Sequence, residues 1–427
     1  MTTADAPPVE APDRPGDRRS SVVVLGVSAV VLVALAAWLV PWHPVPGGTP
    51  GPAAPGSVFT PEEIQRAEEF ARTTRTWIWS SLAVSLVVAC LFGFTRLGRR
   101  LVGRLPGPWF LRVVLAVAVL ELLGRMLTLP FAVLLRREVL AHGLSTQSWW
   151  GFAYDQAVGE LVTILTTAVP LLLVIACARR WRRAWPAVAG PMLAGLVLTG
   201  SFFHPLVVEP LFNSFTPLPH GELRTQILQL AEHEHVPVDE VLVADASRRT
   251  TTLNAYVSGF GSTRRVVLFD NVVDSLPREQ TLTIVAHELS HARHGDVVTG
   301  TLLGAAGAGL GIGLLGLLVG AIGGRRRLAM GDPAVVPLVL ALIAVGALVA
   351  SPVQGGMSRQ IETRADVDAL RATEDPDAFI TMQRELALRS LADPTPPAWT
   401  QFWFGSHPTV LQRVALARDV QQRHTHR

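Results

Sequence analysis

The stretch TIVAHELSHARHGD, Thr283–Asp296, places two histidines four residues apart with a glutamate directly after the first. Apolar residues between the polar ones predict a helix over residues 277–296, with Ser275 as its N-cap. Residues four apart share a helix face, so His287 and His291 can direct their imidazoles at one ion. Glu288 lies beside them as a general base. The alternative is a pair of solvated histidines on an amphipathic helix.

A catalytic zinc ion needs a third protein ligand and one position left for water. His294 is unsuitable because it lies about 10 Å further along the helix axis than His287. We interpret it as a surface or supporting residue. Glu362 and Asp366, in SRQIETRADVDAL, share a face at i, i+4. Glu362 can ligate the ion while Asp366 fixes a histidine tautomer, although such a pair is also typical of a solvated helix face.

The rest of the chain predicts a membrane protein. Of 427 residues, 49 % are apolar and 17 % charged, and the mean hydropathy is +0.35. The apolar residues form seven blocks long enough to cross a bilayer. They cover residues 21–40, 76–95, 109–135, 160–178, 184–207, 297–322 and 333–350. The expected fold is mostly α and integral to the membrane, with seven transmembrane helices and a small α/β zinc metallopeptidase domain that the last two spans split.

The predicted organisation follows from these blocks. A disordered tail covers 1–20, and five spans lie within 21–207, with a Pro/Gly-rich linker at 41–58. The metalloprotease domain begins with 208–296, is interrupted by a transmembrane hairpin at 297–350 and ends with 351–427. Thr60 is the expected N-cap of the helix that leads into the second span. Residues 238–245 and 263–273 are expected strands.

Composition narrows the other possibilities. Cys90 and Cys177 lie inside apolar blocks, which excludes a disulfide framework or a cysteine zinc site. A net charge of +3 gives no reason to expect nucleic acid as a partner. All basic residues are arginine, which with the Ala, Gly and Pro content is typical of a GC-rich bacterial genome, so the expected location is a bacterial cell membrane. The sequence indicates no oligomeric state.

Five motifs occur in a characteristic order, namely EPLFNSFTPLP, LNAYVSGFGSTRRVVLFDNVV, HELSHARHGD, SRQIETRAD and GSHPTVLQR. In this order they resemble the type I CAAX prenyl proteases, a family of membrane-embedded zinc metallopeptidases, and the related bacterial membrane stress proteases. The seven-span layout is similar to the CAAX type. One departure is Asp296, where the CAAX enzymes usually keep a histidine and the stress proteases more often have aspartate.

The resemblance implies roles for individual residues. It implies one Zn²⁺ per chain on His287, His291 and Glu362, with Glu288 as the general base. It also implies that Asp366 hydrogen-bonds a ligating histidine. It places Asn254, Ala255 and Tyr256 in an edge strand that binds the substrate backbone. His407 matches a catalytic histidine that steadies the tetrahedral oxyanion, and Arg359 matches a supporting arginine.

The expected function is therefore a membrane-embedded zinc metalloendopeptidase that is similar to the CAAX proteases and acts on peptides or proteins. One alternative is a quality-control protease of the stress-response type, and another is a catalytically silent membrane scaffold. The orientation stays open. Arginine clusters on the side opposite HELSH place the site outside by the positive-inside rule, whereas eukaryotic relatives place it at the cytosolic face.

Overall fold

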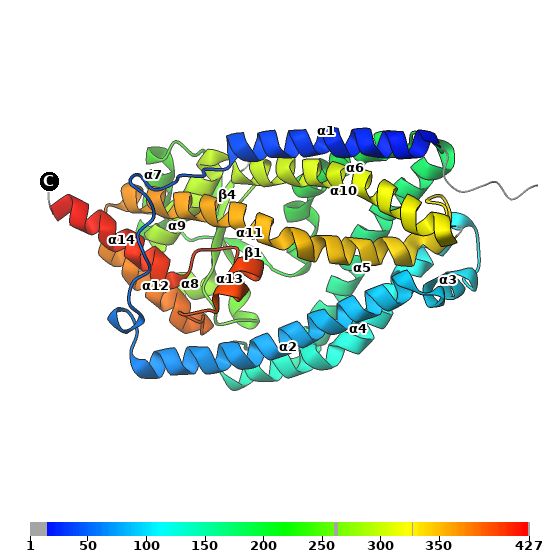
Figure 1. The fold of residues 1–427 in the computed structure, drawn as a ribbon. Coiled ribbons are helices and arrows are strands. Elements are labelled where there is room, and N and C mark those ends of the chain that lie inside the picture. Colours follow the sequence, from blue (N-terminus) through cyan, green and yellow to red (C-terminus); the bar gives the residue numbers. More distant parts are fainter. Residues whose placement is uncertain (1–14, 260–263, 327, 426–427) are drawn as a thin grey trace, which may run out of the picture.

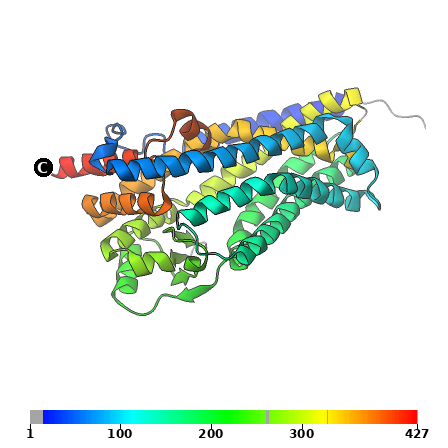
Figure 2. The same ribbon diagram turned by 90° about the horizontal axis from the view of Figure 1, so that it is seen from below.

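The computed structural model describes residues 15–259, 264–326 and 328–425. Long helices run side by side along one axis, and a sheet with shorter helices gathers at one end (Figure 1). Figure 2 shows the same division from below, with the C-terminal helix at the end that holds the sheet. Residues 1–14 of the predicted tail lie outside the described residues, and residues 15–20 form the first turns of a helix.

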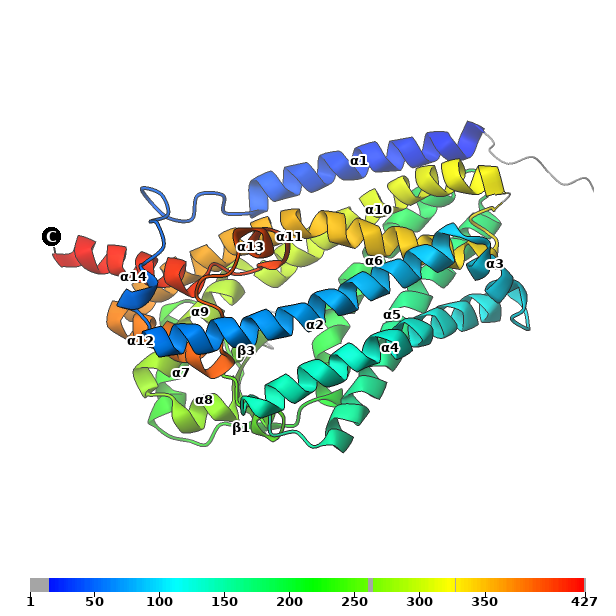
Figure 3. The same ribbon diagram turned by 60° about the horizontal axis from the view of Figure 1, so that its bottom comes forward.

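Seven long helices form the bundle among the residues described. They are α1 Pro15–Leu39, α2 Pro61–Phe94, α4 Trp109–Ala141, α5 Trp149–Arg180, α6 Trp185–Val207, α10 Asp296–Arg326 and α11 Val336–Thr373. The short helix α3, Arg96–Gly103, joins α2 to α4 at the end away from the sheet (Figure 3). Their shared core is apolar and contains fully buried residues such as Val117, Ile175 and Val339.

Six helices in the described part are long and apolar enough to cross a membrane. They lie at Arg18–Leu39, Pro61–Phe94, Trp149–Arg180, Trp185–Leu211, Asp296–Gly323 and Pro333–Thr373. The predicted third span is the helix α4, which is not among the six and carries Glu121 and Arg125 near its middle. The membrane character of the chain is thus confirmed, with six candidate spans rather than seven.

The helix start predicted at Thr60 is present. The Thr60 backbone N–H donates to Glu63 Oε2 at 2.9 Å, and the Glu63 N–H donates to Thr60 Oγ1 at 3.3 Å. This reciprocal pair satisfies two N–H groups that the first turn of a helix would otherwise leave unpaired. The polar first turns of α2 therefore form a regular helix, which continues into the apolar part of α2.

The domain at the end of the bundle is built on a four-stranded sheet. Its strands are β1 Phe215–Pro217, β2 Glu240–Ala244, β3 Ala255–Ser258 and β4 Arg265–Phe269. Their order is β1-β2-β4-β3, with β2 and β4 parallel and the other pairs antiparallel. The helices around the sheet are α7 Glu222–His233, α8 Asp270–Ser275, α9 Arg278–His294, α12 Pro376–Ser390, α13 Ala398–Phe404 and α14 Val410–Thr425. Short 3-10 turns lie at η1 Pro55–Ser57, η2 Glu209–Leu211, η3 Ala246–Arg248 and η5 Pro333–Val335.

The last membrane hairpin connects two parts of this domain. The α9 helix ends at Gly295, and α10 leaves the domain from Asp296. The returning helix α11 is continuous for 38 residues, with Pro352 inside it. Its apolar first half packs in the bundle, and its second half packs against α9, with Ala365, Ala369 and Leu370 fully buried. One rigid rod therefore carries the predicted third ligand from the membrane to the HExxH helix.

Two local predictions are wrong. Ser275 is not the N-cap of the HExxH helix. It ends α8, where its hydroxyl donates to the Asn271 carbonyl, and α9 begins at Arg278 after Pro277. The strand predicted over 263–273 is shorter, because Asp270 begins α8. The Asp270 carboxylate accepts hydrogen bonds from the Ser247 N–H at 2.8 Å and its hydroxyl at 2.5 Å, which turns the chain at that point.

Gly295 sets the angle between α9 and α10. Its φ of 64° is left-handed, and nothing surrounds a Cβ placed there. We expect Gly295→Ala to lower the free energy of unfolding by about 1 kcal/mol through backbone strain alone. Thermal unfolding in detergent measures this. Gly300→Ala, in the regular helix α10 and equally open, is the control. Equal melting temperatures for both variants would contradict the strain argument.

Candidate metal centre

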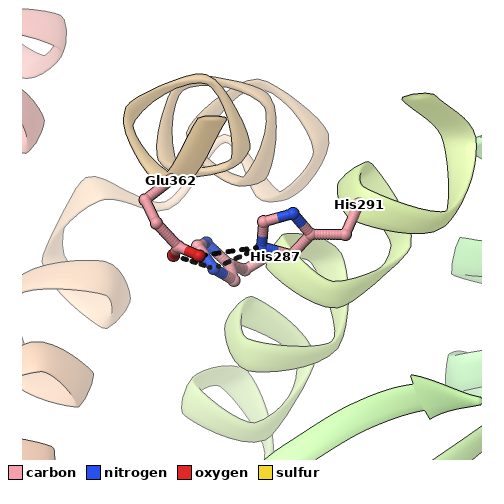
Figure 4. A group of neighbouring side chains, drawn as sticks. All are labelled: His287, His291 and Glu362. Atoms are coloured by element: carbon pink, nitrogen blue, oxygen red, sulfur yellow. Dashed lines mark hydrogen bonds and ion pairs between the residues drawn. The ribbon is translucent and has the colours of Figure 1, made fainter. Parts of the chain in front are cut away.

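Three side chains from two helices converge at the end of the bundle. His287 and His291 come from α9 and Glu362 from α11, and they point toward one another (Figure 4). The two Nε2 atoms are 3.2 Å apart. Glu362 Oε2 is 3.3 Å from His287 Nε2, and Glu362 Oε1 is 3.7 Å from His291 Nε2. Each residue offers a ligand atom within 4.8 Å of the others, so the structure brings together the three side chains that the sequence analysis named as ligands.

Each histidine is held from behind by a carboxylate. His287 Nδ1 is 3.0 Å from Asp366 Oδ1, and His291 Nδ1 is 2.9 Å from Asp296 Oδ2. A neutral imidazole that donates from Nδ1 has its lone pair on Nε2. Burial lowers the pKa of His287, but its hydrogen bonds with Asp366 and Glu362 outweigh burial and raise that pKa to about 10. A metal ion would displace the Nε2 proton, and in the resulting neutral form both Nε2 lone pairs face the Glu362 carboxylate.

An arginine supports each of these carboxylates. Arg413 on α14 binds Asp366 through Nε at 2.8 Å and through Nη2. Arg364 on α11 binds the other oxygen of Asp296. Asp366 is fully buried, where a carboxylate is tolerated only if it is paired and hydrogen-bonded. Each imidazole is thus oriented by its own carboxylate and arginine. We call these two sets, His287–Asp366–Arg413 and His291–Asp296–Arg364, the His–Asp–Arg relays.

The donor set fits a divalent cation. Glu362 Oε2 is buried and makes no close hydrogen bond among the described residues, and it faces the Nε2 atoms of His287 at 3.3 Å and of His407 at 3.4 Å. The group holds four carboxylates and two guanidinium groups, which leaves two negative charges when both histidines are neutral. Two imidazoles with one carboxylate and an open position match the preference of a catalytic Zn²⁺ site. The residues present therefore fit a metal ion.

Glu288 lies half-buried next to this cluster, within electrostatic range of His287, His291 and Arg413. Burial raises the pKa of its carboxyl group above the usual value, and the neighbouring His287 and His291 oppose that rise. A carboxylate in such surroundings accepts a proton more readily than one in water.

His407 reaches the cluster from the chain between α13 and α14. Its Nε2 is 3.4 Å from Glu362 Oε2, while Ser406 Oγ lies 2.8 Å from its Nδ1. Gln401 Nε2 donates to the His407 carbonyl at 2.6 Å. A Cβ at Gly405 would lie 2.5 Å from the Gln401 side-chain amide, so a larger residue there would displace the amide that holds the His407 carbonyl. The His407 side chain is 58 % exposed, which leaves it accessible to a substrate.

Arg359 does not touch the metal cluster. From α11, its Nη1 donates to the Gln401 carbonyl at 3.2 Å and to the Gly405 carbonyl. It therefore ties the end of α13 to α11 and fixes the segment from which His407 projects.

The segment Asn254–Tyr256 lies where β3 begins, and β3 is the edge strand of the sheet. The Phe269 N–H donates to the Asn254 carbonyl at 3.0 Å, so the alternate residues Ala255 and Val257 direct their backbone groups away from β4. Ala255 is buried, Asn254 is exposed, and Val257 is half-buried. The Tyr256 hydroxyl donates to Glu209 Oε2 at 3.3 Å.

His294 stays outside the cluster, as predicted. Its Nε2 is 2.9 Å from Asp368 Oδ2, which also accepts a hydrogen bond from Ser290 Oγ at 2.8 Å. Arg293 Nη2 is 2.8 Å from the same oxygen. This network clamps the last turns of α9 onto α11 and so supports the register of the HExxH helix.

Sequence reasoning missed three residues of the site. Arg413, Arg364 and the supporting role of Asp296 were not predicted. Asp296 was noticeable only as a departure from the CAAX pattern, and Arg413 stood in the quoted GSHPTVLQR motif. No local spacing could have revealed the ion pairs, because their partners lie on other helices.

Comparison with known proteins agrees with this geometry. The model of peptidase family M48 matches residues 217–421, and that of the CAAX prenyl protease N-terminal region, described as five membrane helices, matches 49–214. The chain belongs to peptidase family M48. As a member of this family with membrane helices, it is a multi-pass membrane metalloprotease, which confirms the enzyme class predicted from its sequence.

Relatives of this M48 chain occur in bacteria and eukaryotes. It is 27 % identical over 378 residues to the "Uncharacterized metalloprotease YhfN" of Bacillus subtilis, covering 86 % of this chain and 88 % of that protein. It is 34 % identical over 160 residues to a "CAAX prenyl protease 1 homolog" of Oryza sativa, covering 35 % and 36 % of the two proteins. The crystal structure of S. mikatae Ste24p shares the fold, with a TM-score of 0.74 at 18 % identity, covering 95 % of this chain and all of that one.

The carboxylates behind the histidines lead to a prediction about metal affinity. We expect Asp366→Asn and Asp296→Asn each to weaken metal binding about 10- to 100-fold, because the imidazole loses its orienting partner. Titration with a competing chelator measures the affinity.

Asp393→Asn is the matched control, since Asp393 also pairs with an arginine, Arg75 at 2.6 Å, but contacts no histidine of the cluster. Equal losses in the control and in the two test variants would show that the effect is general destabilisation.

Proposed function

We propose that this membrane metalloprotease is a zinc endopeptidase in which His287, His291 and Glu362 hold the ion. The convergence of the Nε2 atoms of His287 and His291 on the buried Glu362 carboxylate carries this proposal. A bound Zn²⁺ would polarise the scissile carbonyl and lower the pKa of water beside it. The bacterial relative and the arginine-only basic composition support a bacterial cell membrane as its location.

Protein side chains carry out the remaining steps of the reaction. Glu288 takes the proton of the attacking water and passes it to the leaving amine nitrogen, for which its raised pKa and its place beside the cluster suit it. The His407 Nε2–H, next to Glu362, donates a hydrogen bond to the oxyanion that develops on the carbonyl. Ser406 and Arg359 hold His407 in that position.

An extended peptide would bind along β3. The outward backbone groups at Val257 and the exposed Asn254 suit the addition of a strand at an open sheet edge. Such binding recognises mainly the peptide backbone, so the enzyme would accept many sequences that reach the site in an extended form. This breadth is compatible with both a CAAX-like and a quality-control substrate range.

We also propose that α4 is a seventh membrane span. The helix runs alongside α2 and α5 (Figure 3), and the residues around Glu121 and Arg125 are apolar. The described chain begins at one end of the bundle and finishes at the other (Figure 1), which needs an odd number of crossings. Ionisable groups inside a span usually face the bundle interior rather than lipid.

Two substitutions separate metal binding from turnover. We expect Glu362→Ala to lose zinc occupancy, because two imidazoles alone hold the ion poorly. We expect Glu288→Gln to keep zinc and to lower kcat about 10²- to 10⁴-fold, since only the base is removed. Metal analysis of the purified chain, together with hydrolysis of a fluorogenic peptide, measures both. Full zinc content in the Glu362 variant would exclude that residue as a ligand.

The proposed oxyanion role makes a distinct prediction for His407. We expect His407→Ala to lower kcat about 10²- to 10³-fold with zinc content unchanged, because the donor acts on charge that develops in the transition state. Steady-state kinetics on the same peptide test this. A change confined to KM would assign His407 to substrate binding instead.

A further inference from the structure

The helix α13, with the sequence AWTQFWF, exposes an aromatic surface next to the site. Trp399 is 50 % exposed and Phe402 is 55 % exposed, and the two lie three residues apart on one helix face. Phe404 is 44 % exposed, and α13 has no buried residue. Large aromatic groups are costly to leave in water, so this surface favours an apolar or amphipathic partner.

The position of α13 indicates which partner this is. The Trp399 ring packs on the Trp79 ring of α2 at 4.3 Å between centroids. Trp79 lies just after Arg75, the last charged residue before the uncharged part of that membrane helix. Along the long axis of the molecule, α13 lies level with the end of α1 (Figures 1 and 3), where Trp38 is 83 % exposed.

These aromatic residues therefore form one belt at the level where the spans leave the membrane. Trp and other aromatic side chains gather at this boundary because the ring is apolar while the indole N–H finds polar partners. The aromatic surface of α13 is continuous with the lipid-facing bundle through Trp79 and α2. A lipid surface, rather than a soluble protein, fits that continuity.

The same helix is tied to His407. Gln401, within α13, donates to the His407 carbonyl, and Arg359 of α11 holds the Gln401 and Gly405 carbonyls. His407 follows α13 by three residues and lies 3.4 Å from Glu362 through its Nε2. A displacement of α13 would thus be transmitted to His407 through these few hydrogen bonds.

We propose that α13 rests in the headgroup layer of the bilayer and that this contact holds His407 in register with the metal cluster. The catalytic part of this inference rests on the proposed function, whereas the lipid contact does not. The enzyme would then be fully active only when the bilayer supports α13.

The lipid contact is tested by fluorescence quenching. The full chain is placed in phosphatidylcholine vesicles that contain lipid brominated near the headgroup or near the end of the acyl chain. The difference between the wild type and Trp399→Phe gives the Trp399 signal. We expect stronger quenching by the shallow bromine than by the deep one. Lack of quenching by both lipids would overturn the lipid contact and point to a second copy or another protein on this surface.

The coupling is tested by kinetics in the same vesicles. We expect Phe402→Ser to lower kcat about 10- to 100-fold with KM and zinc content kept, because a small misplacement of His407 is enough for that loss. Phe402→Trp should restore kcat, since it restores an interfacial ring. Trp38→Ser, at the same membrane level but with no path to His407, should keep wild-type kcat.

Each outcome decides a separate part of the proposal. Unchanged kcat in Phe402→Ser, or equal losses in Trp38→Ser, would overturn the coupling. Full activity of Glu288→Gln would instead overturn the proposed catalytic mechanism, while the quenching result for α13 would still stand.

Discussion

The contact between α9 and α11 is the constraint on which the rest of this structure depends. It brings the Nε2 atoms of two imidazoles and a buried carboxylate to one point, which is the donor set of a cation site. The surrounding structure holds this contact through the Asp368 network and through the two His–Asp–Arg relays. The site is therefore assembled before an ion binds, and ion binding would need little rearrangement of the surrounding side chains.

The membrane hairpin gives this contact its geometry. Because α11 continues without interruption from the bundle into the domain, the positions of Arg359, Glu362 and Asp366 are fixed by one rigid helix. Sites built on helices are held more precisely than sites built on loops. His407, by contrast, lies on a loop, which Gln401 and Arg359 hold through the carbonyls of His407 and Gly405.

The sequence predicted those parts of the site that follow from local periodicity. The HExxH spacing and the i, i+4 pair of Glu362 and Asp366 are properties of single helices, and the structure has both helices. No local pattern contains the pairing of the two helices; it was inferred from the need of a catalytic zinc ion for a third ligand, and the resemblance implied the same set. The ion pairs of Asp296 with Arg364 and of Asp366 with Arg413 join separate helices, so their recognition needed coordinates. Ser275 was misplaced because the short helix α8 competes for the same residue.

Charge balance connects the local departure at Asp296 to the whole centre. The carboxylate at this position accepts from His291 and from Arg364 at the same time. A neutral side chain at this position would leave the Arg364 guanidinium without its counter-charge in a largely buried place, which costs about 3–5 kcal/mol. Asp296 and Arg364 therefore act as one unit, because the carboxylate compensates the guanidinium charge and orients His291 at the same time.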